Sequence, residues 1–122
     1  MTDKLVRRAR RGHIHRMSNV SNIAVSSIRA AGARFAAHAA NIANLNSPGY
    51  VALRPEQIST AYGPVVRISK PGKSRPEAQK QGDVDLAREF LGVIASKYDH
   101  KAAVILLRTE QELSGSLLDT LA

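Results

Sequence analysis

An alanine-rich segment near the start of the chain restricts the folds that this sequence can adopt. Nine alanines fall between Ala24 and Ala43, and alanine has the highest helix propensity of any residue. The larger apolar residues Ile28, Phe35 and Ile42 are seven apart, so they share one helix face. We expect residues 18–46 to form one helix, roughly 40 Å long. A helix of this shape needs a partner to cover its apolar face.

A second long helix is predicted for residues 83–122. Asp83 can cap its N-terminus, and Glu89 would place negative charge near the positive end of the helix dipole. An apolar stripe recurs at helical spacing along this segment: Leu91, Ile94, Tyr98 and Ile105. The predicted fold is mainly α, with the two long terminal helices packed through facing stripes as an antiparallel hairpin.

Residues 47–82, between the helices, have a different composition. The sequence Ser47-Pro48-Gly49-Tyr50 predicts a type II turn, because proline fixes the second position and glycine supplies the positive φ of the third. Strand-like runs at 50–53 and 65–68, separated by turn residues that include Gly63 and Pro64, predict a short β-hairpin. The polar stretch 71–82 contains two prolines and is typical of a flexible connector. Residues 18–122 should form one domain.

The composition limits how much core an isolated chain can build. The chain has 122 residues, of which 4% are aromatic, and it has no tryptophan. Aromatic side chains contribute most to core burial. A chain of this length and composition is expected to obtain further burial by binding a partner.

The net charge of +8 is concentrated at the N-terminal end. Residues 1–16 contain six basic side chains and only one acidic side chain, for a net charge of +5. We expect residues 1–17 to form a disordered basic arm, or translation to begin at Met17. Such an arm can bind phosphate backbones without sequence specificity.

The most informative motif lies where the first helix is expected to end. Asparagines at helix ends can bond to nearby backbone groups or adopt the left-handed conformation. The motif consists of a helix end rich in asparagine followed by the predicted turn: Asn41, Asn44, Asn46, Ser47, Pro48, Gly49 and Tyr50.

This segment resembles the N-terminal signature of the flagellar rod and hook axial proteins, Ala-Asn-Asn-Ile-Ala-Asn-x-x-Thr-Pro-Gly-Tyr. Eight of the ten specified positions match, whereas Ser47 replaces threonine and Ala40 replaces the first asparagine. Residues 83–90, DVDLAREF, resemble the family's Asn-Val-Asp-Leu-x-x-Glu-Met opening of the C-terminal helix. His100 and Ala103 stand where the family usually has the Tyr and Asn of its mid-helix Tyr-x-Ala-Asn motif.

The resemblance implies a structural subunit of the bacterial flagellar basal-body rod, a small and divergent member of the proximal-rod type. In that family the terminal helices pack into a helical tube with other rod subunits and with copies of the same chain. Family members are exported through the flagellar type III apparatus to the periplasmic space without a cleaved signal peptide. The packing stripe implied here comprises Ile28, Phe35, Ile42, Leu91, Ile94, Tyr98 and Ile105.

The residues do not predict an enzyme, a cofactor, a small-molecule substrate or a metal site. His13 and His15 have the spacing of two metal ligands, but they lie among basic residues and have no evident third ligand. Ser96, Asp99 and His100 are the residue types of a catalytic triad, yet neighbours on a helix point apart. His38 is a lone histidine in the alanine-rich helix, which favours a packing role.

Two alternatives to a rod subunit remain open. A divergent paralogue could act as an adaptor at a junction or at the export apparatus without polymerising. A nucleic-acid-binding protein could use the Arg-rich arm, although nucleic acid is not the expected partner. The second alternative predicts salt-dependent duplex binding that disappears when residues 1–16 are deleted.

Overall fold

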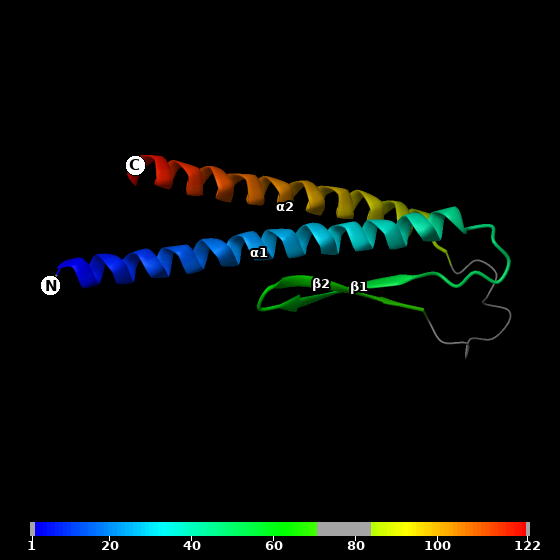
Figure 1. Cartoon of the computed structure of the whole chain (residues 1–122). Helices are drawn as coiled ribbons and strands as arrows, with labels where there is room; N and C mark the ends of the chain where they lie inside the picture. Colours follow the sequence, from blue (N-terminus) through cyan, green and yellow to red (C-terminus); the bar gives the residue numbers. More distant parts are fainter. Residues whose placement is uncertain (1, 71–83, 122) are drawn as a thin grey trace.

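The computed structural model describes residues 2–70 and 84–121, with side chains for residues 19–70 and 84–120. It contains two helices and two strands: α1 (Thr2–Ala43), β1 (Arg54–Thr60), β2 (Gly63–Ser69) and α2 (Leu86–Leu121). Helix α1 lies in the middle, with α2 along one side and the β-hairpin along the other (Figure 1). The predicted helical hairpin with a small extended insert is therefore confirmed.

Helix α1 is longer at its start than the sequence suggested. It begins at Thr2, so the expectation of a disordered arm over residues 1–17 is wrong for the described backbone. Residues 2–17 contain no proline, and five of them are arginine, a good helix former. The basic segment continues the alanine-rich helix.

The end of α1 forms the predicted turn, with one correction. The helix ends at Ala43, not at Asn46, and no described residue other than glycine has a positive φ. Asn44 instead donates from Nδ2 to the carbonyl oxygen of Ala40 at 2.9 Å. Gly49 has a φ of 72°, and the N–H of Tyr50 bonds to the carbonyl oxygen of Ser47 at 3.1 Å, as a type II turn requires.

The β-hairpin is present, but its first strand is not the predicted one. Strand β1 begins at Arg54, whereas residues 50–53 are not in a strand. Thr60 pairs with Gly63 across a two-residue loop, so Gly63 and Pro64 begin β2 instead of forming the turn. Gly63 has a φ of 110°, and a β-carbon there would lie 2.8 Å from Cβ of Ser26. Glycine thus allows the hairpin to approach α1.

Helix α2 begins at Leu86, later than the predicted residue 83. Asp85 is its N-cap, because its Oδ1 accepts a hydrogen bond from the N–H of Arg88 at 3.2 Å. The proposed cap Asp83 and the expected connector at 71–82 lie outside the described residues. Glu89 is in the first turn, where its charge suits the helix dipole.

The two helices meet along a seam of small and polar residues. On α1, Ala24, Ala31 and His38 are seven apart, and both alanines are fully buried. On α2, the seam comprises Glu89, Ser96, Ala103 and Glu110, again seven apart. Every buried apolar residue in the described part of the chain is an alanine. The expectation that the α2 stripe faces α1 is therefore wrong, because that stripe lies on the other side of α2.

Polar contacts fix the antiparallel pairing of the helices. Arg34 Nη2 donates to Asp99 Oδ2 at 2.6 Å, and the hydroxyl of Ser21 bonds to the carboxylate of Glu110. Closer to the turn, His38 Nδ1 lies 2.7 Å from Glu89 Oε2. These pairs are spread along the seam, so each one specifies the same alignment of the helices.

Gly92 lets the helices approach closely where the His38 ring crosses the seam. A β-carbon at this position would lie 2.4 Å from Cε1 and Nε2 of His38. Gly32 of α1 has no such role, because a β-carbon there would meet nothing within 4 Å. The essential small residue is therefore on α2.

We predict that Gly92→Ala destabilises the fold. Alanine would gain about 1 kcal/mol in helix propensity, but it would displace the His38 ring and break its contact with Glu89, a loss of about 1.5–3 kcal/mol. Thermal unfolding monitored by circular dichroism should show a lower Tm. Gly115→Ala is the matched control, because the space around Gly115 is open, and its Tm should rise slightly. A raised Tm for Gly92→Ala would contradict this account of the seam.

Candidate functional site

The signature segment is organised around Asn41, which lies in the last turn of α1 and is 0% exposed. Its side chain bonds to both backbone groups of Leu53: Nδ2 donates to the carbonyl oxygen at 2.8 Å, and Oδ1 accepts from the N–H at 2.7 Å. The amide thus replaces the strand partner that Leu53 would have in a sheet. This contact explains why residues 50–53 do not form the predicted strand.

Two further hydrogen bonds complete the environment of Asn41. The hydroxyl of Tyr50 donates to Oδ1 at 2.9 Å, and Nδ2 donates to Glu89 Oε2 at 3.0 Å. An asparagine amide has two N–H donors and two acceptor positions, so all of them are used. Asn41 therefore connects the end of α1, the turn, the segment leading into β1 and the first turn of α2.

Glu89 brings a negative charge into this buried region. It is 5% exposed, and its Oε2 bonds to both Asn41 and His38. A buried carboxylate requires such partners because desolvation of an unpaired charge is costly. The sequence indicated only a favourable charge near a helix N-terminus. It gave no signal that Glu89 would be buried against Asn41.

The hydroxyl of Tyr50 belongs to this network, and its pKa is shifted. Burial, with a smaller contribution from the negative charge of Glu89, raises the pKa of Tyr50 above its ordinary value of 10.0. The phenol therefore stays protonated at neutral pH and can donate to Asn41. This network holds backbone segments together, and every hydrogen-bonding position of the Asn41 amide at its centre is occupied.

The residue types of a catalytic triad are not brought together. The carboxylate of Asp99 bonds to Arg34 of α1, whereas the hydroxyl of Ser96 is buried without a hydrogen-bond partner. His100 is exposed on α2. The side chains of His13 and His15 lie outside the described part. Among the described residues, no three His, Cys, Asp or Glu side chains are grouped as a metal site.

The largest apolar side chains lie on the side of α2 that faces away from α1. Successive residues of a helix turn by roughly 100°, so the stripe Leu91, Tyr98 and Ile105 lies opposite the seam residues Glu89, Ser96 and Ala103. Tyr98 is 66% exposed and Ile105 is 54% exposed. With Ile94, which is also exposed, these residues form what we call the outer stripe: Leu91, Ile94, Tyr98 and Ile105.

The three predicted packing residues on α1 have a different environment. Ile28 and Ile42 are half-buried, and Phe35 is exposed. At 100° per residue they fall at the edge of the face that carries Ala24 and Ala31. The structure thus places the α1 residues beside the seam and the α2 residues opposite it, so the predicted set does not form one continuous surface.

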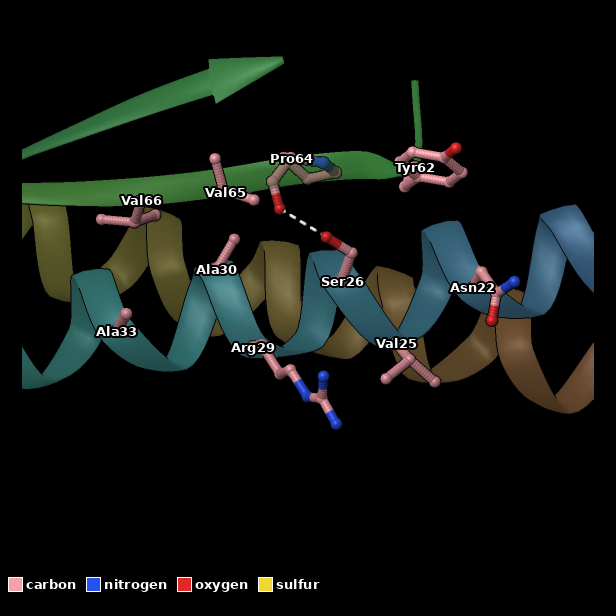
Figure 2. A pocket seen from close by; sticks show the side chains of 10 residues that line it. All are labelled: Asn22, Val25, Ser26, Arg29, Ala30, Ala33, Tyr62, Pro64, Val65 and Val66. Carbon is pink, nitrogen blue, oxygen red and sulfur yellow. Dashed lines mark hydrogen bonds between the residues drawn. The ribbon is translucent and has the colours of Figure 1, made fainter. Parts of the chain in front are cut away.

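A groove of about 600 Å³ lies between α1 and the hairpin (Figure 2). Its α1 side includes Val25, Ser26, Arg29 and Ala33, and its hairpin side includes Tyr62 and Val65. The hydroxyl of Ser26 donates to the carbonyl oxygen of Pro64 at 2.6 Å, which attaches the start of β2 to α1. No sequence pattern indicated this groove, because the groove depends on where the hairpin packs.

The chain matches no protein-family model and no curated protein. In the described part of the chain, neither helix has a stretch that is long and apolar enough to span a bilayer.

We predict that Asn41→Ala destabilises the fold by about 2–4 kcal/mol, because it removes the partner of both backbone groups of Leu53 and one of the two partners of Glu89. Denaturant unfolding followed by circular dichroism measures this change. Asn44→Ala is the control, since the Asn44 side chain bonds only near its own helix end, to Ala40 and Ser47. Equal losses for the two variants would show that Asn41 is not the organising residue.

A second prediction concerns pH. Because the folded chain holds the Tyr50 proton more tightly than the unfolded chain, its contribution to stability is complete below pH 10 and is lost as the pH rises through the raised pKa. The free energy of unfolding should fall more steeply above pH 10 for the native chain than for Tyr50→Phe. If the free energy of unfolding depends on pH in the same way for both proteins, the effect does not come from Tyr50.

Proposed function

We propose that this chain is a structural subunit of the bacterial flagellar basal-body rod. The observation that carries the proposal is the outer stripe, a line of large apolar side chains on the side of α2 that α1 does not cover. The resemblance of the two terminal motifs to the axial family supports the same conclusion. Subunit packing uses the outer stripe, with Phe35 and the half-buried Ile28 and Ile42 at the edge of the α1 seam.

The distribution of burial also supports an assembling subunit. An alanine core stabilises an isolated chain weakly, since hydrophobic stabilisation is roughly proportional to the buried apolar area. In contrast, the exposed residues of α2 include leucine, isoleucine, phenylalanine and tyrosine. Burial of these side chains against neighbours would supply the stabilisation that the hairpin lacks. The proposed partners are other rod subunits, copies of the chain and the flagellar type III export apparatus.

The signature network would set the shape of the subunit. Asn41 fixes the turn and the start of the hairpin relative to both helices. The signature positions Asn44, Ser47 and Gly49 form the helix end and the turn itself. The outer stripe and the hairpin would thereby have the same relative position in every copy, which a regular helical assembly requires.

The first experiment is sedimentation and circular dichroism of the full chain, alone and mixed with other rod subunits from the same cell. A rod subunit should be a small species of low thermal stability alone, and should gain mass and thermal stability in the mixture. A compact, stable monomer that does not associate with those subunits would contradict the proposal. It would favour an adaptor at a junction or at the export apparatus.

We predict that Ile105→Glu prevents this co-assembly without lowering the helix content of the isolated chain. A buried side chain of this size contributes about 1.5–3 kcal/mol, so we expect at least about a tenfold loss of affinity. Gln111→Glu adds the same charge at another exposed position of α2 and should co-assemble normally. Normal co-assembly of Ile105→Glu would exclude the outer stripe from the interface.

A further inference from the structure

We propose that the groove between α1 and β2 receives the C-terminal part of α2, residues 109–120, from a second copy of the chain. This inference rests on the proposed assembly and specifies one contact within it. It is carried by the position of the groove, by the charges of the two surfaces and by the exposed leucines at the end of α2.

The groove is on the side of α1 that faces away from its own α2. Ala24, Ala31 and His38 define the face toward α2, since His38 contacts Glu89. Arg29 and Ala33, which line the groove, are each two residues from Ala31 and therefore about 160–200° around the helix. In Figure 2 the α2 ribbon runs behind α1, and in Figure 1 α2 and the hairpin lie on opposite sides of α1. The α2 helix of the same chain therefore does not fill it.

The end of α2 provides exposed apolar side chains. Leu113 is 58% exposed, and Leu117 and Leu118 are also exposed. Toward this end the two helices diverge (Figure 1). The described polar contact nearest to the end of α2 that joins it to α1 is the one between Ser21 and Glu110. The terminal leucines are thus available to another copy.

The charges of the two surfaces are complementary. Among the described residues, the one charged side chain that lines the groove is that of Arg29, whereas residues 109–120 contain Glu110, Glu112 and Asp119 and no basic residue. In the described part of the chain, neither Arg29 nor Glu112 has a hydrogen-bond or ion-pair partner. Arg29 lines the otherwise largely apolar groove, and Glu112 continues the seven-residue spacing of Tyr98 and Ile105. These two residues would form an ion pair beside the contact of Leu113 with the groove.

The dimensions also agree. The groove extends along α1 from Asn22 to Ala33, and this stretch and residues 109–120 each span roughly 18 Å at about 1.5 Å per residue. The two surfaces are different, so the contact is heterologous, and each copy still offers a free groove or a free helix end. Repetition of this contact adds copies in one direction instead of closing a dimer.

Cysteine trapping of the full chain tests this contact, because the native chain has no cysteine. Ala33→Cys and Leu113→Cys are made as separate single-cysteine variants, mixed, oxidised mildly and separated on a non-reducing gel. We expect the mixture to form several-fold more linked dimer than either variant alone. The matched control replaces Leu113→Cys by Leu86→Cys, an exposed leucine at the other end of α2 and outside the outer stripe. Equal yields in the test and control mixtures would overturn the proposal.

Charge reversal tests the ion pair in the same assay. Arg29→Glu in the Ala33→Cys chain, or Glu112→Arg in the Leu113→Cys chain, should each reduce the dimer yield several-fold. The mixture of both reversed chains should restore the yield. Without restoration, the assignment of Arg29 and Glu112 as partners is wrong. Circular dichroism of each variant checks that its helix content is unchanged.

The outcomes separate this inference from the proposed function. If trapping fails while the native chain still co-assembles with rod subunits, the groove contact is wrong and the rod assignment stands. If trapping succeeds while co-assembly fails, copies of the chain associate through the groove in some other structure.

Discussion

The structure depends on one physical constraint: the Asn41 amide is fully buried, so its four hydrogen-bonding positions must be satisfied within the protein. They are satisfied by Leu53, Tyr50 and Glu89, which come from three different parts of the chain. No alternative placement of the turn or of α2 keeps these bonds. In a chain whose core consists of alanine, this polar network supplies the specificity that large interdigitating side chains supply elsewhere.

A second theme is the separation of small from large residues. Small residues such as Ala31, Ser96 and Ala103 line the seam, where they allow the helix backbones to approach. Large residues such as Tyr98 and Ile105 lie on the opposite side of α2. In a self-sufficient hairpin the large residues would be inside. The reverse arrangement, together with the groove on the far side of α1, gives the molecule two different faces on opposite sides.

Much of this fold follows from local sequence signals, whereas the site does not. Alanine content, the spacing of Leu91 and Tyr98, and the Pro48-Gly49 turn predicted the helices and their connection, because these signals act within a few residues. The bond between Asn41 and Glu89 joins residues 48 positions apart, and nothing local indicates it. The same limit explains the errors: Leu53 belongs to a strand-like run, but its backbone is occupied by a side chain. The spacing of its residues predicted the outer stripe, but spacing alone does not show which side of a helix packs against the neighbouring helix.

The seam has a mechanical consequence. Alanines and serines present a nearly smooth surface, so apolar contact alone would permit one helix to slide along the other at little cost. Three polar pairs at separate heights along that surface oppose such sliding: Ser21 with Glu110, Arg34 with Asp99, and His38 with Glu89. An axial shift of a single turn disengages all three at once. Under an axial force the two helices should therefore keep their alignment up to a threshold and then lose the three polar pairs in one step.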